Sequence, residues 1–137
     1  MLKYLDYWDI VLFSLLSIYP IIWRYSATYS YSIGVFAIGL GLIIWWAGRL
    51  TLGDAATWLP IAKKIVTRGI YSKIRHPIYI GQALCAAGWI FIIESLAVRV
   101  ICVAIILITI VRAILEERVL TKRFGKQYLE YKKRTLF

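Results

Sequence analysis

Four apolar stretches divide the chain and most strongly constrain its fold. They span residues 7–23, 31–50, 77–93 and 96–115. Each is close to the ~20 residues that an α-helix needs to cross a bilayer core, although the first and third are somewhat short. Hydrophobic residues make up 61% of the chain and the mean hydropathy is +0.73, which argues against an ordinary soluble domain. The pattern predicts an all-α fold, an integral membrane helical bundle of about four transmembrane helices forming a single domain over residues 1–137.

Basic residues are distributed unevenly between the predicted connections. The formal net charge of +10 is by itself compatible with nucleic-acid binding. Of the 17 Lys and Arg residues, however, only Arg24 and Arg99 fall in the first and third connections. The others lie at the N-terminus, in the second connection, or from the end of the fourth stretch onward. The positive-inside rule therefore predicts a multi-pass cell-membrane protein with both termini and the second connection in the cytoplasm, and no nucleic-acid partner.

Cysteines and glycines inside the apolar stretches are expected to serve packing. Cys85 and Cys102 are predicted to be small buried hydrophobic residues, which supports neither a disulfide nor a metal site. The second stretch carries glycines whose spacing allows a neighbouring helix to approach closely. These are Gly34, Gly39, Gly41 and Gly48. A G-x-G nucleotide-binding motif at residues 39–41 is the weaker alternative, because no strand precedes it.

The polar segments after the second and fourth stretches are predicted to lie at the cytoplasmic surface. Residues 51–75 are long for a helix connection, and their apolar and aromatic content argues against disorder. We expect a re-entrant or interfacial connection, and an additional interfacial helix within residues 51–68 stays open. Residues 118–137 interleave apolar and aromatic side chains with Lys and Arg, which predicts an amphipathic C-terminal tail on the inner leaflet.

The third stretch opens with His76 and Pro77, a pair that predicts where its helix begins. Proline lacks a backbone donor and disfavours helical geometry in the residue before it, so we expect His76 at the cap and Pro77 in the first turn. His76 and Tyr79 then project on one face. The free amides and positive dipole end of the helix form an anion site, here flanked by Lys73 and Arg75. A carboxylate or phosphate would fit there.

Helix lengths bring charged residues of the fourth stretch to the level of His76. Glu94 and Ser95 predict a tight outer turn between the two helices. Counting from Ser95, His76 lies 19 residues back, whereas Arg112 and Glu117 lie 17 and 22 residues forward. These separations correspond to about 28, 25 and 33 Å at the helical rise. All three residues are therefore expected at the same cytoplasmic level.

The charged residues of this region also have structural explanations. Arg112 alone is compatible with snorkelling to the interface or with an ion pair to Glu116 four residues later. Glu116 and Glu117 directly follow an apolar helix, where acidic residues oppose the helix dipole and need compensation. That compensation comes from Arg112, Arg118 or a cationic ligand.

Several short motifs in the second half of the chain are specific as an ordered combination. They are Val-Thr-Arg-Gly-Ile-Tyr at residues 66–71, Arg-His-Pro-Ile-Tyr-Ile-Gly at residues 75–81 with Gly88-Trp89, Arg112 with Glu116-Glu117, and Phe124-Gly125 with Tyr128 and Tyr131. Through them the chain resembles the isoprenylcysteine carboxyl methyltransferase and phospholipid methyltransferase group of integral membrane enzymes. The resemblance covers about the last half of the chain. Ile70 stands where the family commonly has proline, and the chain lacks the extra helices of the larger eukaryotic enzymes.

The resemblance implies methyl transfer from S-adenosylmethionine, bound at the cytoplasmic end of the last two helices and enclosed by the second connection and the tail. The cofactor-binding half is then about residues 64–137. The implied cofactor-binding residues are Gly69, Tyr71, Arg75, His76, Pro77, Tyr79, Gly81 and Glu116. Arg112 and Glu117 are implied as the catalytic pair facing the methyl acceptor, with no metal. The implied partners are membrane lipids and a lipidic or prenylated acceptor.

Two classes of acceptor are open, and Arg112 favours the first. O-methylation of a lipidic or lipid-anchored carboxylate needs no base at neutral pH, and a guanidinium can hold such a carboxylate bidentately. N-methylation of an amine phospholipid would require removal of a proton, with Glu117 as the candidate general base. A non-catalytic scaffold that binds anionic lipid is the alternative from a different class. A channel or transporter is disfavoured because the sequence lacks broken-helix repeats and ionisable residues deep in the bilayer.

Overall fold

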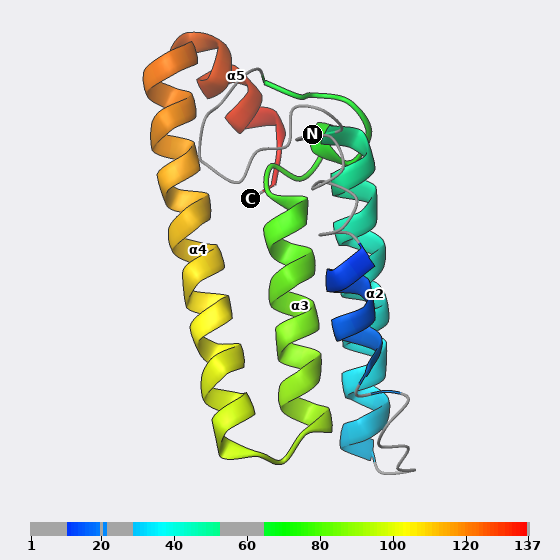
Figure 1. The fold of residues 1–137 in the computed structure, drawn as a ribbon. Helices are drawn as coiled ribbons and strands as arrows, with labels where there is room; N and C mark the ends of the chain where they lie inside the picture. The colour runs from blue at the N-terminus through cyan, green and yellow to red at the C-terminus, as the bar shows by residue number, and fades with distance from the viewer. Residues whose placement is uncertain (1–10, 20, 22–28, 53–64, 137) are drawn as a thin grey trace, which may run out of the picture.

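The described part of the protein is built from helices, as predicted. The computed structural model describes residues 11–19, 21, 29–52 and 65–136, and this part contains no strand beyond one isolated bridge. The helices are α2 (Tyr29–Leu52), the short 3₁₀ helix η2 (Gly69–Ser72), α3 (Pro77–Ile92), α4 (Leu96–Phe124) and α5 (Lys126–Arg134), and residues 11–19 are also helical. Helix α3 lies between α2 and α4, and α5 folds back over the end at which α3 begins (Figure 1).

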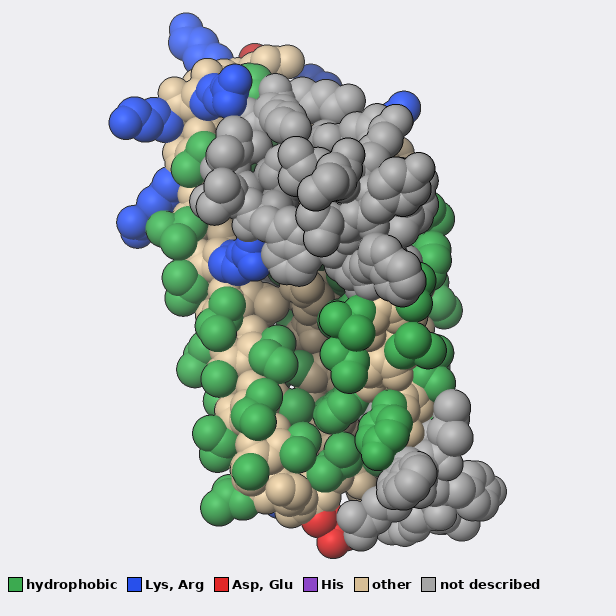
Figure 2. Space-filling model, viewed as in Figure 1, with side chains coloured by type: hydrophobic (Ala, Val, Ile, Leu, Met, Phe, Trp, Pro, Cys, Tyr) green, Lys and Arg blue, Asp and Glu red, His purple; other side chains and the backbone are tan. Residues whose placement is uncertain are grey.

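Two of the described helices are long and apolar enough to cross a membrane. They are α2, with 24 residues, and α4, with 29 residues. Helix α3 is also apolar, but its 16 residues span only about 24 Å of a ~30 Å hydrocarbon core. Large apolar side chains are exposed along the helices, while Lys and Arg gather at the end where α4 meets α5 (Figure 2). This surface is typical of a membrane-associated protein. The count of four membrane helices stays a prediction. Both ends of the first apolar stretch, residues 7–23, lie outside the described residues.

Glycines bring α2 and α3 into close contact. Three on α2 and two on α3 recur at intervals of seven residues: Gly34, Gly41, Gly48, Gly81 and Gly88. A methyl group added at Gly81 would lie 2.6 Å from the carbonyl oxygen of Gly41, and one at Gly88 would lie 2.6 Å from that of Gly34. Real Cβ atoms essentially never approach so closely. The two backbones therefore meet directly, as the glycine content of the second stretch predicts.

Gly39 is the exception, and its predicted packing role is wrong. No described residue lies within 4 Å of a Cβ built at Gly39, which is exposed and does not meet α3. Gly41 packs against Cys85 and the backbone of Gly81. Of the two glycines in the G-x-G sequence, only Gly41 therefore has the predicted packing role. Cys85 and Cys102 are buried free thiols, as predicted.

Helix α4 is longer than the apolar stretch that predicts it. The apolar stretch ends at residue 115, whereas the helix continues to Phe124 and projects its last turns beyond the apolar part. Residues 116–124 are rich in Glu, Arg, Lys and Leu, which favour helix even where no apolar face drives it. Gly125 ends the helix with φ 51°, a backbone conformation that other residues rarely adopt. The chain then reverses into α5.

One face of the C-terminal segment packs on the protein, so the predicted amphipathic tail does more than lie on a surface. Tyr128 on α5 is fully buried, with 0% of its surface exposed. Beyond α5, the Leu136 amide donates to the Lys73 carbonyl at 2.7 Å, and the Arg75 amide donates to the Leu136 carbonyl at 3.2 Å. The tail is thereby fastened to the segment before α3. The proposed interfacial helix within residues 51–68 falls largely outside the described residues.

Candidate functional site

The start of α3 is built as the His76-Pro77 pair predicts. His76 is the N-cap residue with φ −123° and ψ 52°, and Pro77 occupies the first turn. The His76 side chain makes no capping hydrogen bond to the helix. Pro77 is fully buried, and its ring lies against Gly48 of α2. The helix end is thus held by packing, while its first amides keep the positive end of the dipole.

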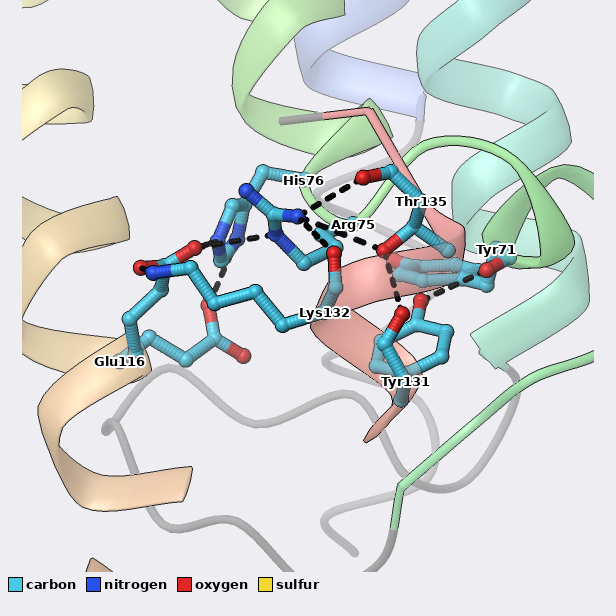
Figure 3. Close-up of polar contacts among 8 residues, drawn as sticks. Tyr71, Arg75, His76, Glu116, Tyr131, Lys132 and Thr135 are labelled. Atoms are coloured by element: carbon cyan, nitrogen blue, oxygen red, sulfur yellow. Dashed lines mark hydrogen bonds and ion pairs between the residues drawn. The ribbon is translucent and has the colours of Figure 1, made fainter. Parts of the chain in front are cut away.

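The imidazole of His76 lies between two carboxylates of α4. Its Nδ1 is 3.7 Å from Oε2 of Glu116, and its Nε2 is 3.5 Å from Oε1 of Glu117 (Figure 3). These contacts confirm that the start of α3 and the polar end of α4 lie at one level. Only 9% of the His76 side chain is exposed, and this burial lowers its pKa although both carboxylates act in the opposite direction. His76 is therefore neutral at pH 7.

Arg75 links α4 to the C-terminal segment. Its Nε donates to Glu117 Oε1 at 3.0 Å, and its Nη1 donates to the carbonyls of Lys132 and Thr135 at 3.0 and 2.9 Å (Figure 3). The side chain of Arg75 is 12% exposed. The guanidinium thus neutralises an acid on α4 and also satisfies orphan carbonyls at the end of α5.

Glu117 pairs with two cations. Besides Arg75, it accepts a hydrogen bond from Lys132 Nζ at 2.6 Å. Glu117 follows the apolar part of α4, and although burial acts to raise its pKa, the hydrogen bond and charge of Lys132 and the charge of Arg75 lower it overall. Because α4 continues to Phe124, Glu117 lies about two turns before the helix end, and the expectation that it opposes the helix dipole at a C-terminus is wrong. The two cations neutralise its charge directly.

The Tyr79 ring lies between His76 and Arg112. The ring of Tyr79 stacks on His76 with centroids 5.8 Å apart. The guanidinium carbon of Arg112 lies 6.0 Å from the centroid of the Tyr79 ring. The charges of Glu116 and Arg112 both act electrostatically on the Tyr79 hydroxyl. Arg112 therefore belongs to the site and reaches it next to Tyr79 and Glu116.

A second aromatic contact fixes α5 to η2. The Tyr131 hydroxyl donates to the Tyr71 carbonyl at 2.6 Å (Figure 3). Burial raises the pKa of Tyr131 to about 12 and also raises the pKa of Tyr71. Both phenols consequently stay neutral at physiological pH and serve as hydrogen-bonding and packing groups.

The residues predicted from the sequence divide into two groups. The residues that converge on one another are Arg75, His76, Tyr79, Arg112, Glu116 and Glu117. The others pack against neighbouring helices: a Cβ at Gly69 would lie 2.8 Å from Thr51, Gly81 contacts α2, Pro77 contacts Gly48, and Tyr71 meets α5. Binding roles for either group stay predictions.

Tyr128 and Tyr131 belong to the family motif seen in the sequence, but the predicted site residues include none from α5 or its end. The structure adds Tyr128, Lys132 and Thr135, together with the role of Tyr131 as an anchor. Their spacing of three or four residues, which puts them on one helical face, is the signal that could have identified them. A basic amphipathic pattern is equally typical of a membrane-surface helix, so the sequence favoured that interpretation.

The arrangement suits a ligand that carries both a cationic and an anionic group. Glu116 is 34% exposed and offers a carboxylate to a cation, while the uncapped start of α3 favours an anion. The Tyr128 hydroxyl is buried and lacks a hydrogen-bond partner among the described residues, while His76 Nε2 has only the 3.5 Å contact with Glu117. Buried polar groups are rarely left unpaired unless another molecule satisfies them. The described residues contain no group of three or more His, Cys, Asp or Glu that could hold a metal ion.

Comparison with known proteins agrees with this geometry. No curated protein and no solved structure gives a significant match to the chain. The sequence model of one family, however, matches residues 29–127, which include α2, α3, α4 and the whole carboxylate and arginine cluster. This match covers well over half of the 137 residues, and its description is phospholipid methyltransferase. The chain therefore belongs to the phospholipid methyltransferase family of membrane enzymes.

Proposed function

We propose that the protein is an S-adenosylmethionine-dependent methyltransferase whose site is the junction between the start of α3 and the polar end of α4. The observation that carries the proposal is the placement of His76 between Glu116 and Glu117, within a chain of a methyltransferase family that acts on lipids. The partly exposed Glu116 beside a buried neutral imidazole supports a ligand site over a non-catalytic scaffold, because ion pairs within the described residues account for Glu117, whereas Glu116 forms none there with Lys or Arg.

The residues present fit the chemistry of this methyl donor. Its amino-acid end carries an ammonium group, for which Glu116 supplies a carboxylate, and a carboxylate group, for which the start of α3 supplies free amides. The buried Tyr128 hydroxyl, which has no hydrogen-bond partner among the described residues, supports the presence of a further polar ligand. When bound, S-adenosylmethionine supplies a methyl group already activated by its sulfonium. The protein's own task is to align the acceptor and to exclude water.

Arg112 supports a carboxylate as the methyl acceptor. Its position beside Tyr79, at the boundary between the apolar and polar parts of α4, lets a lipid-anchored carboxylate approach from the membrane. The planar guanidinium can hold such a group by two parallel hydrogen bonds and fix its angle. No general base is needed, because the carboxylate is ionised at neutral pH. A lipidic or prenylated carboxylate is therefore the first candidate.

An amine phospholipid is the second candidate, and the family description favours it. This reaction needs a base, since only the unprotonated amine is nucleophilic. Glu117 is the predicted base, but it is held by Arg75 and Lys132, and its lowered pKa makes it a poor proton acceptor. The amine candidate thus requires that substrate binding displace Lys132 from Glu117.

The same proposal assigns the site to the cytoplasmic face of the cell membrane. Lys and Arg gather at the end of the described structure that carries the site (Figure 2). The positive-inside rule then puts this end and the termini in the cytoplasm, with four crossings of one domain. Single cysteines at residues 64 and 133 should resist a membrane-impermeant reagent in intact cells. Labelling of either from outside would overturn this topology.

Labelled methyl transfer tests the activity and separates the two acceptors. Purified protein in detergent is incubated with methyl-labelled S-adenosylmethionine and a lipid extract, and the labelled product is then treated with mild base. A carboxyl methyl ester releases labelled methanol, whereas an N-methylated headgroup keeps its label. Release of the label supports the carboxylate acceptor, retention supports the amine lipid, and absence of labelled lipid contradicts both.

A further inference from the structure

The hydroxyl of Tyr128 is buried and has no hydrogen-bond partner in the part of the chain that the structure describes. Tyr128 lies on α5 and has 0% of its surface exposed, yet its hydroxyl makes no hydrogen bond to any described residue. A buried hydroxyl that has lost its water without gaining a partner destabilises the folded state. Phenylalanine would fill the same volume without this penalty. The hydroxyl therefore calls for an explanation other than packing.

The charged groups around Tyr128 are those of the proposed active site. Glu117, Arg75 and Glu116 all act electrostatically on its hydroxyl, and burial raises its pKa, so the phenol stays protonated at neutral pH. Glu117 and Arg75 already bind each other and the C-terminal segment. The unpartnered hydroxyl is thus buried on the helix whose Lys132 pairs with Glu117, among the charged groups of the proposed site.

The helix that carries Tyr128 is held in place independently of the hydroxyl. Arg75 binds the Lys132 and Thr135 carbonyls, and the Tyr131 hydroxyl binds the Tyr71 carbonyl. The rings of Tyr128 and Tyr131 lie 6.0 Å apart, but only the second has its hydroxyl satisfied within the protein. The two tyrosines on the same helix thus differ in hydrogen bonding as well as in burial, and they form a useful pair for comparison. Tyr131 anchors α5, whereas the Tyr128 hydroxyl contributes no hydrogen bond to that anchoring.

We propose that the Tyr128 hydroxyl binds the methyl donor, so that α5 supplies a ligand-contacting residue to the site as well as closing it. This inference rests on the proposed function. The chemical partner is the amino-acid end of the donor, whose ammonium and carboxylate can exchange hydrogen bonds with a neutral phenol beside Glu116. The C-terminal helix is then part of the binding site itself.

Tyr128→Phe and Tyr131→Phe, compared with the parent protein, test the proposal. The probe is S-adenosylhomocysteine, the chemically stable product of methyl donation, titrated calorimetrically into detergent-solubilised full chain. Thermal unfolding without the probe is measured in parallel. For Tyr128→Phe we expect affinity to fall about tenfold, the scale of one hydrogen bond, while the apo unfolding temperature stays unchanged or rises. For Tyr131→Phe we expect the apo unfolding temperature to fall, because a formed hydrogen bond is lost.

The outcomes separate this inference from the function on which it rests. Parental affinity in Tyr128→Phe, with the parent binding the probe, overturns the role of the hydroxyl and leaves the function standing. A fall in apo stability of Tyr128→Phe as large as that of Tyr131→Phe also overturns it, since the hydroxyl would then be structural. A parent protein that binds neither S-adenosylhomocysteine nor S-adenosylmethionine removes the proposed function and this inference with it.

Discussion

Replacing Gly81 with alanine should push α3 away from α2. An ideal Cβ at this position lies 2.6 Å from both the Gly41 carbonyl oxygen and Trp45 Cβ, whereas ordinary contacts begin at 3.4 Å. The obstructing atoms are backbone or directly attached to it, so the helices must separate by roughly 1 Å. Overpacking of this kind typically costs ~1–3 kcal/mol. Alanine also favours helix over glycine by about 1 kcal/mol, which partly masks the effect.

Gly39→Ala is the matched control, because none of the residues that the structure describes lies within 4 Å of a Cβ there. Both variants gain the same helix propensity, so the difference between them isolates the steric cost at Gly81. Reversible unfolding by sodium dodecyl sulfate in mixed micelles gives the two free energies of unfolding. We expect Gly81→Ala to be less stable than Gly39→Ala by about 1–3 kcal/mol. Equal stability would refute the close packing of α2 on α3. Equal stability with lost cofactor binding would favour direct contact of Gly81 with the ligand.

Three further predictions concern the site. A lysine at position 75 cannot reach Glu117 and two carbonyls together. Arg75→Lys should therefore destabilise the fold by ~2–4 kcal/mol and speed amide hydrogen exchange in α5. The control Arg134→Lys should have neither effect. His76, the only histidine, should titrate below 6.5 by NMR. Stability should therefore decline as pH falls below 6.5, because the unfolded chain binds the proton that the buried imidazole resists. Arg112→Lys should keep cofactor affinity but lose methyl transfer by roughly 10²-fold, about 2.7 kcal/mol, and a fully active variant would favour the snorkelling explanation.

Helix positions follow closely from the sequence. The apolar stretches at residues 31–50 and 77–93 become α2 and α3 within two residues at each end. The His76-Pro77 cap is predicted because proline restricts the backbone on both sides of it. The sequence predicts that His76 and Glu117 lie at the same height along the two helices. The turn between the helices is short, so this height depends only on the number of residues from the turn to each side chain. These features depend on local geometry alone.

The faces of helices are predicted less completely. Gly34, Gly41 and Gly48 repeat every seven residues and share the face against α3, whereas Gly39 lies about 140° round the helix from Gly34. A count of glycines does not separate these positions, but their helical angle does. On α5, Tyr128 and Lys132 also share one helical face, which packs on the protein. The amphipathic pattern alone predicts that this face lies on the membrane.

Long-range backbone contacts are beyond sequence reasoning here. Arg75 finds its partners in the carbonyls of Lys132 and Thr135, some sixty residues away, and every residue type offers a carbonyl. The turn that makes these contacts possible depends on the positive φ of Gly125. Glycine permits that conformation without specifying the direction in which the chain leaves it. The fastening of the tail over the site thus emerges only from the folded structure.

Equilibrium binding of S-adenosylmethionine tests the central claim most directly. The parent, Glu116→Ala and the control Glu130→Ala, altered at an exposed residue of α5, are titrated calorimetrically in the same detergent. Because the claim puts the donor's ammonium against Glu116, loss of that charge-assisted contact should weaken binding about ten- to a hundredfold, or ~1.5–3 kcal/mol. Glu130→Ala should bind like the parent. A parent that does not bind S-adenosylmethionine, or a Glu116→Ala variant that binds with parental affinity, would contradict a donor site at the junction of α3 and α4.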